Sequence, residues 1–171
     1  MFVNFLRKNV YAAGVLALFR IYLGWEFLKA GWEKLAGPEP FDARGFLVGA
    51  AKKAVGEHPA VPGWWADFLN GFAIPNAGFF NFLIPWGELL VGIAMIAGIF
   101  TTFAALMGII MNFAFLFSGS TSTNTQMVLL AIFVLVAGAN AGKFGLDYYV
   151  LPYLKKYTGK TFARELETKA H

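Results

Sequence analysis

The chain has 171 residues, of which 58% are hydrophobic, 18% are aromatic and only 14% are charged. An ordinary soluble domain carries about 25% charged residues, and disordered chains are polar and rich in charge. The composition therefore excludes a disordered chain and argues against a soluble globule, because too few polar residues remain to cover its surface. The net charge of +4 comes from the flanks of the apolar stretches. It indicates membrane topology and not a nucleic-acid surface.

The residue types that usually hold metals and carry electrons are scarce. The chain has no cysteine, and His58 and His171 both lie outside the apolar stretches. Cys-ligated zinc, iron–sulfur clusters and haem held by two intramembrane histidines are thereby excluded. We expect this chain to bind no metal or haem, so in any redox reaction its own side chains would not carry the electrons.

Long uncharged stretches predict helices that cross a membrane. The 54 residues between Glu88 and Lys143 contain no Asp, Glu, Lys or Arg. As a helix they would measure about 80 Å, more than two bilayer cores of about 30 Å, so they must fold back. The sequence predicts an all-α integral membrane four-helix bundle that forms one domain over residues 1–171. Its expected spans cover about residues 10–30, 79–100, 103–118 and 127–146. Arg20 interrupts the first span, which favours a retained helix over a signal peptide.

The segment of residues 31–78 is expected to lie outside the membrane and to be partly helical. Asp42 is placed to cap a helix with an apolar face, and a second helix carries Trp64, Trp65 and Phe68 on one side. Aromatic residues of this kind favour the membrane interface. The segment is either a lid over the mouth of the bundle or an amphipathic cover without a gating function.

The distribution of Lys and Arg predicts the orientation in the cell membrane. With both termini in the cytoplasm, eight Lys and Arg residues flank the spans on the inside and four on the outside. Because cytoplasmic flanks are enriched in these residues, we expect this multi-pass topology. The basic and aromatic tail of residues 151–171 is then cytoplasmic and is expected to lie against anionic lipid.

Arg20 and Glu88 are the two charged residues that fall deepest within the predicted spans. Counted from the outer ends of their spans, at Ala30 and Phe79, they reach similar depths, so we expect them to meet. Intramembrane ionisable residues are usually functional, although a buried ion pair can serve only to fix helix registry. Both readings stay open, and Arg20 and Glu88 are the candidate catalytic residues.

Four further residues are candidates for ligand binding. Glu26 falls about one turn inside the predicted boundary and would extend a polar path toward Arg20. Asn112 lies in the middle of the third span, where an amide more often joins two helices by a hydrogen bond. Trp25 and Trp86 would give a planar apolar ligand suitable walls, although packing and lipid contact are the commoner roles of such residues.

Two stretches of the sequence resemble the signatures of a known membrane protein family. The sequence FRIYLGWEFLKAGWEKL of residues 19–35 resembles the first-helix signature of the DoxX family, and PWGELLVGIAMIAGIFTTFAAL of residues 85–106 resembles the second. The positions that carry the resemblance are Arg20, Gly24, Gly31, Lys34, Gly87 and Glu88. The long segment between the first two spans is more similar to the DoxD branch, the large membrane subunit of thiosulfate:quinone oxidoreductase.

The resemblance implies a four-helix membrane protein, and it implies a membrane subunit of a quinone-linked oxidoreductase, of the thiosulfate:quinone type, as the leading hypothesis. Arg20 would then donate to a quinone carbonyl, and Glu88 would relay protons. Electrons would come from the substrate or from a second oxidoreductase subunit, and a second copy of the chain is a further candidate partner beside the lipid bilayer. The alternative is a non-enzymatic carrier of an anion or small molecule, or a scaffold of the same fold.

Overall fold

The computed structural model describes residues 1–154, 156 and 157 of the chain. The described part is α-helical and contains no strand. Its elements are α1 (Phe2–Lys8), α2 (Val10–Ala36), α3 (Ala43–Lys52), α4 (Gly63–Phe68), the π-helix η1 (Leu69–Ala73), α5 (Ala77–Ala97), α6 (Thr101–Phe117), α7 (Asn124–Ala137) and the 3₁₀-helix η2 (Gly138–Gly142). Most of the predicted tail of residues 151–171 lies outside the described residues.

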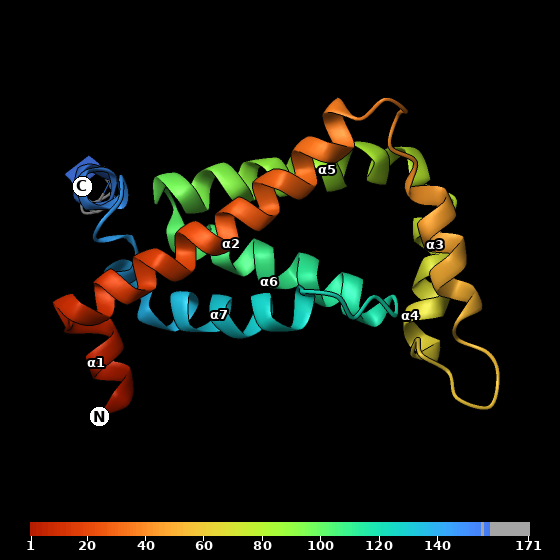
Figure 1. Cartoon of the computed structure of the whole chain (residues 1–171), viewed down its shortest axis with the longest axis horizontal. Helices are drawn as coiled ribbons and strands as arrows, with labels where there is room; N and C mark the ends of the chain where they lie inside the picture. Colours follow the sequence, from red (N-terminus) through yellow and green to blue (C-terminus); the bar gives the residue numbers. More distant parts are fainter. Residues whose placement is uncertain (155, 158–171) are drawn as a thin grey trace, which may run out of the picture.

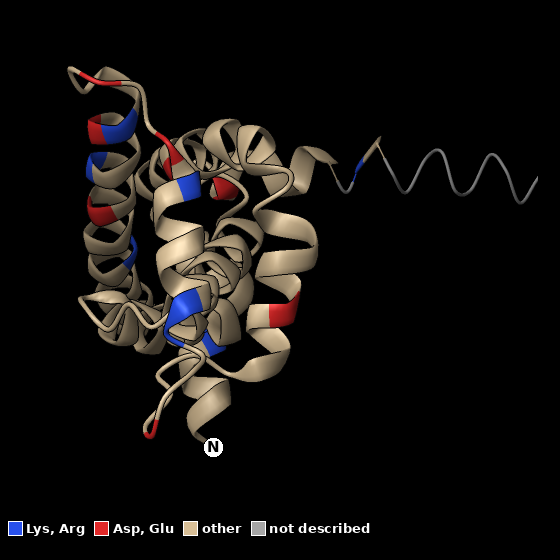
Figure 2. Ribbon diagram, turned by 90° about the vertical axis from the view of Figure 1, so that its right-hand side faces the viewer, with Lys and Arg blue, Asp and Glu red and all other residues tan. Residues whose placement is uncertain are grey.

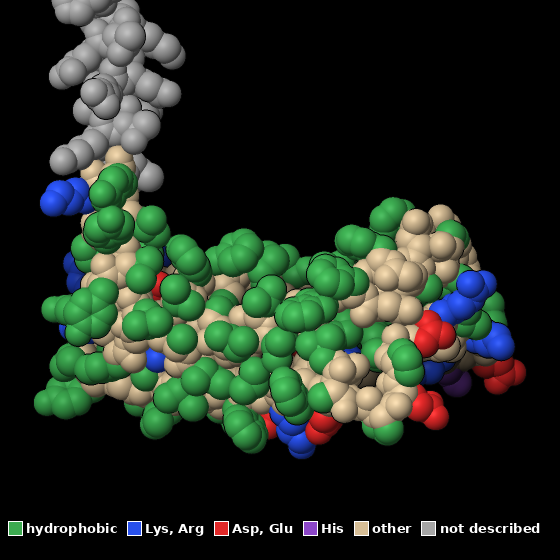
Figure 3. Space-filling model, turned by 90° about the horizontal axis from the view of Figure 1, so that it is seen from above, with side chains coloured by type: hydrophobic (Ala, Val, Ile, Leu, Met, Phe, Trp, Pro, Cys, Tyr) green, Lys and Arg blue, Asp and Glu red, His purple; other side chains and the backbone are tan. Residues whose placement is uncertain are grey.

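Helices α2, α5, α6 and α7 form the bundle, with α3 and α4 at one end and α1 at the other (Figure 1). α2, α5 and the combined segment Asn124–Gly142 are each long and apolar enough to cross a membrane, and α6 is a shorter apolar helix. Hydrophobic side chains cover the middle of the face seen in Figure 3, and acidic and basic side chains gather at the end that holds α3. Figure 2 shows long stretches of ribbon without any charged residue. The chain is therefore an all-α membrane helical bundle.

Two helices end at residues other than the predicted ends of their spans. α2 continues to Ala36, six residues past the expected end at Ala30. The charged residues in its last turns indicate polar surroundings, but they do not end the helix. The helix ends before Gly37, which is extended, because Pro38 has no N–H group to donate and disfavours the helical conformation of the residue before it. The last span was expected to reach residue 146. α7 instead ends at Ala137, where Gly138 adopts a positive φ of 59°, and the chain continues as 3₁₀-helix.

The segment between α2 and α5 packs on the start of α5 and the end of α6. Asp42 caps α3 as predicted, since its Oδ1 accepts a hydrogen bond from the Arg44 backbone N–H. A small apolar cluster joins α3, η1 and the start of α5. Trp65 donates from Nε1 to Ser118 Oγ at 2.9 Å, and its ring contacts Phe117. The segment is thus packed against α6 through a half-buried aromatic residue.

Candidate functional site

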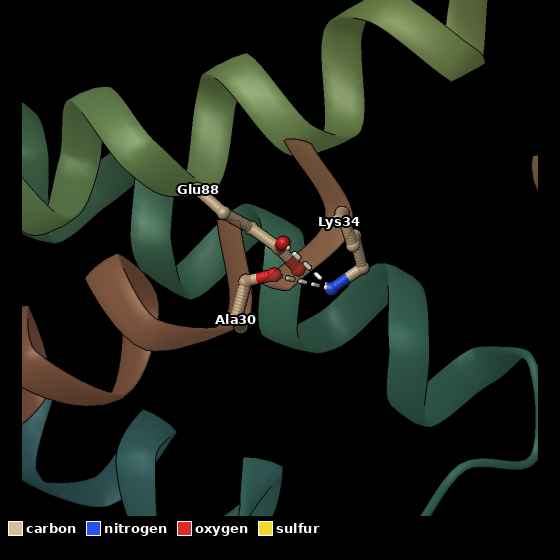
Figure 4. Close-up of polar contacts among 3 residues, drawn as sticks. All are labelled: Ala30, Lys34 and Glu88. Atoms are coloured by element: carbon tan, nitrogen blue, oxygen red, sulfur yellow. Dashed lines mark hydrogen bonds and ion pairs between the residues drawn. The ribbon is translucent and has the colours of Figure 1, made fainter. Parts of the chain in front are cut away.

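Glu88 lies near the middle of α5 and is buried, with only 2% of the residue exposed. Its Oε2 accepts a hydrogen bond from Lys34 Nζ at 2.7 Å, and the same Nζ donates to the Ala30 carbonyl at 3.3 Å (Figure 4). Charge-assisted hydrogen bonds of this length are among the stronger polar contacts in proteins. The ion pair therefore offsets part of the free energy required to bury a carboxylate among apolar helices.

Glycines bring α2 and α5 close enough for this ion pair to form. A Cβ atom on Gly31 would lie 2.6 Å from the Leu89 backbone nitrogen, and one on Gly92 would lie 2.5 Å from that of Leu28. Real side chains do not fit at such distances, so only glycine permits this helix approach. The contacts set Glu88 beside the last turns of α2 and within reach of Lys34.

The predicted pairing of Arg20 with Glu88 is wrong. The helix register places Arg20 against Gly98, ten residues along the chain from Glu88, which corresponds to a rise of about 15 Å. The prediction assumed that both helices end at the same level, at Ala30 and Phe79. α2 instead continues to Ala36, and the first turns of α5 extend beyond it and pack against α3 and η1. Counting residues from these two expected ends gave Arg20 and Glu88 similar depths, although the two ends lie at different levels in the bundle.

Arg20 belongs to a second polar cluster, beside the turn between α5 and α6. Its guanidinium lies between Gly98 and Gly145, and a Cβ atom on either glycine would overlap the guanidinium. Nη2 donates to the Phe144 carbonyl at 3.0 Å, whereas Nε and Nη1 are buried without a hydrogen-bond partner among the described residues. The surroundings of Arg20 are therefore closely packed.

Asp147 supplies the opposite charge in this cluster and was missed by the sequence analysis. Its carboxylate accepts hydrogen bonds from the backbone N–H groups of Phe100 and Thr101, at 2.7 and 2.8 Å. Its own N–H donates to the Gly98 carbonyl at 2.7 Å. Asp147 is the first acidic residue after the long uncharged stretch, and this position in the sequence is the feature that could have identified it as a candidate. Both of its oxygens bind the start of α6, so this carboxylate is structural.

A cavity of about 320 Å³ opens beside the Lys34–Glu88 ion pair. Small-molecule sites typically occupy about 300–1,000 Å³ and combine apolar walls with a few convergent polar groups. Aromatic and aliphatic side chains supply most of the wall here, and polar groups from α2, α5, α6 and the loop before α7 supply the rest. The lining residues are Glu26, Phe27, Ala30, Lys34, Phe41, Phe46, Ile84, Glu88, Asn112, Phe115, Ser120, Ser122, Thr123, Asn124 and Met127.

The cavity brings together Glu26, Glu88 and Asn112, three of the predicted site residues. Asn112 is 1% exposed, and its amide Nδ2 has no hydrogen-bond partner within the part of the chain that the structure describes. Trp25 and Trp86 instead lie on the surface, 58% and 42% exposed, and are not among the lining residues. Their position fits contact with lipid.

Lys34 and the hydroxyl groups near the cavity mouth were not predicted as ligand-binding residues. The position of Lys34 near the end of α2 gives no sign in the sequence that its side chain reaches Glu88. Ser120, Ser122 and Thr123 come from the polar loop between α6 and α7. Among the described residues, no three His, Asp or Glu side chains group as ligands for a metal ion.

Comparison with known proteins assigns the chain to a family. The family model described as DoxX matches residues 15–121, which is more than half of the chain. The chain belongs to the DoxX family. The matched range includes Arg20 and the cavity residues Glu26, Lys34, Glu88 and Asn112, whereas Asp147 lies beyond it. Neither a curated protein nor a solved structure matches the chain.

Proposed function

We propose that this DoxX-family protein is the membrane subunit of a quinone-linked oxidoreductase and that the cavity beside Lys34 and Glu88 binds the quinone head group. One observation carries the proposal. Asn112 lines an aromatic-walled cavity and keeps a buried amide N–H group without a partner among the described residues. A buried donor without a partner costs about 1–3 kcal/mol, so a ligand carbonyl at this point would recover that free energy.

The chemistry of the lining residues fits a quinone. Phe27, Phe41 and Phe115 provide apolar faces for a planar ring, and Asn112 and Lys34 provide N–H donors for its carbonyl oxygens. Glu88 holds a carboxylate at the same wall, where its Oε2 can take up or release a proton. Bound quinone would supply the two-electron redox chemistry that the side chains of this chain lack.

The charge of the cavity favours this ligand over an anion. Two carboxylates, Glu26 and Glu88, and one ammonium group, Lys34, line the cavity and give it a formal charge of −1. Like charges repel strongly where the dielectric constant is low. A neutral quinone therefore suits the site better than thiosulfate, and the electron-donating substrate would bind to a second oxidoreductase subunit. This argument also disfavours an anion carrier.

The orientation is part of the same proposal. We place both termini in the cytoplasm and the chain in the cell membrane, because Lys and Arg are in excess on the terminal side of the spans. A reporter enzyme fused after His171 should then be active only in the cytoplasm. Activity of a periplasmic reporter at the same point would contradict the assignment.

Quinone binding to the purified protein in detergent tests the proposal. Titration with decylubiquinone, followed by calorimetry, should show saturable binding to the unaltered protein. The change Asn112→Leu should weaken the affinity about tenfold, since it removes one buried donor. Asn140→Leu is the matched control, because Asn140 is also buried but donates to the backbone carbonyls of Leu6 and Asn9 at the other end of the bundle.

The control variant should bind decylubiquinone as tightly as the unaltered protein. Absence of binding by the unaltered protein, or equal losses in the two variants, would contradict the proposed function. Thiosulfate uptake by liposomes that contain the protein, without quinone binding, would favour the carrier instead.

A further inference from the structure

A second groove lies at the end of the bundle that carries α1, far from the cavity beside Glu88. It has a volume of about 750 Å³ and is formed by α1, η2 and residues 147–152. Arg7 and Lys143 both line it and are both exposed. Its only carboxylate among the described lining residues is Asp147, whose two oxygens already bind backbone N–H groups of Phe100 and Thr101. The groove therefore carries a formal charge of +1, and its one described carboxylate is engaged by backbone N–H groups and interacts with the Arg20 charge.

Both walls of this groove are held in place by hydrogen bonds. Asn140 on η2 donates to the carbonyls of Leu6 and Asn9, at 2.7 and 2.9 Å, and Arg7 Nε donates to the Val136 carbonyl at 2.9 Å. These bonds fix α1 against the end of α7. The opposite wall is fixed through Asp147 at the turn between α5 and α6. Within the described part of the chain, the two terminal nitrogens of Arg7 make no hydrogen bond, so they can receive an anion.

Apolar surface adjoins the charged groove. α1 also contributes Phe2 and Phe5 to an apolar groove of about 290 Å³ that is completed by Phe19 of α2 and Phe133 of α7. The apolar bundle helices begin at Val10 and end near Gly142, so both grooves lie at the level where hydrocarbon gives way to lipid head groups. Basic grooves at this level suit lipid phosphates, and an adjoining apolar groove suits an acyl chain.

We propose that Arg7 and Lys143 form a binding site for the phosphate of an anionic phospholipid, whose acyl chain lies against Phe2, Phe5 and Phe133. The site is independent of the proposed quinone cavity, because the two share no lining residue. A free phosphate ester shares the head-group chemistry but lacks the acyl chain, so the two sources can be told apart by experiment.

Native mass spectrometry of the full chain, released from nanodiscs of equal phosphatidylglycerol and phosphatidylcholine, tests the site. The unaltered protein should retain phosphatidylglycerol in preference. The double change Arg7→Gln and Lys143→Gln should lower its retention about tenfold, because two cations near the membrane surface are lost. Arg44→Gln with Lys52→Gln removes the same charge at the opposite end of the molecule and should leave retention unchanged.

Further variants distinguish loss of the binding site from loss of folding and from a non-specific effect of charge. Lys143→Glu alters an exposed side chain only, and should reduce retention with an unchanged melting temperature. Arg7→Lys with Lys143→Arg should preserve retention. Equal losses in the Arg44 and Lys52 control, or no loss in Lys143→Glu, would overturn the proposal. Binding of soluble glycerol phosphate as tight as that of the lipid would overturn the assignment to a lipid.

Discussion

Helix α2 carries two cations, the buried Arg20 and the half-buried Lys34, and their surroundings differ. Arg20 lies between two glycines that leave no room for even a methyl group, and the nearby Asp147 carboxylate is engaged by the backbone at the start of α6. Lys34 bonds directly to Glu88 at the wall of a cavity. Arg20 is closely packed and is not among the residues that line the groove at Asp147, whereas Lys34 and Glu88 both line a cavity that also holds the Asn112 donor.

The comparison shows that a buried charge within a membrane helix is not by itself evidence of a binding site. Intramembrane ionisable residues are good functional candidates, but the surrounding packing decides which of them can contact a ligand. The Arg20 side chain packs against the turn between α5 and α6 and helps to stabilise it. Lys34 and Glu88 face a volume that a small molecule can fill.

The largest expected effect is at Asp147. Asp147→Ala removes two hydrogen bonds to the start of α6 and leaves Arg20 without its opposing charge, so we expect a loss of about 3–5 kcal/mol in unfolding free energy. Chemical unfolding in detergent, followed by circular dichroism, measures it. Asp67→Ala on α4 removes the same charge from an exposed position and should change stability little. A small effect at Asp147 would mean that the Arg20 cluster is not structural.

The Lys34–Glu88 ion pair should respond unequally to loss of either partner. Lys34→Met leaves Glu88 buried without a cation, and at pH 7 we expect a loss of about 3 kcal/mol. Glu88→Leu should cost only about 1 kcal/mol, because the Lys34 side chain is already 26% exposed and can turn toward water. The double variant should recover most of the stability lost in Lys34→Met, as measured by thermal unfolding in detergent. Equal losses in the two single variants would contradict this asymmetry.

Substitution of Trp65 tests how firmly the segment between α2 and α5 is fixed to α6. Trp65→Phe removes the hydrogen bond to Ser118 but keeps an aromatic ring against Phe117, so the expected loss is about 1 kcal/mol. Protease cleavage within residues 53–62 should become faster, as followed by gel electrophoresis over time. Trp64→Phe is the control, because Trp64 is exposed. Equal acceleration in both variants would rule out the specific contribution of the Trp65 hydrogen bond.

The smallest expected effect is the coupling between the two clusters. Arg20→Met and Glu88→Leu should change the unfolding free energy additively, within about 0.5 kcal/mol, because the residues lie in separate clusters. A double-mutant cycle in detergent measures the coupling. A coupling above about 1 kcal/mol would mean that Arg20 and Glu88 contact each other and would contradict the observed helix register.

Several features of the fold could be predicted because they depend on composition and local pattern. The uncharged stretch between Glu88 and Lys143 required membrane helices that fold back, and Asp42 before an apolar face indicated a capped helix. The role of Asp147 could not be predicted in this way. Its partners, the N–H groups of Phe100 and Thr101, are 47 and 46 residues away in the chain, and no local pattern connects them.

The sequence by itself determined that the chain is helical, that it is a membrane protein and which few residues carry charge within its apolar stretches. These properties follow from hydropathy and from the need of each backbone group for a hydrogen bond in lipid. Only the tertiary structure decided which charges meet. Close approach of α2 and α5 at Gly31 and Gly92 sets a helix register that counting from the predicted span ends could not supply. In this register Glu88 binds Lys34, and Arg20 lies beside Gly98.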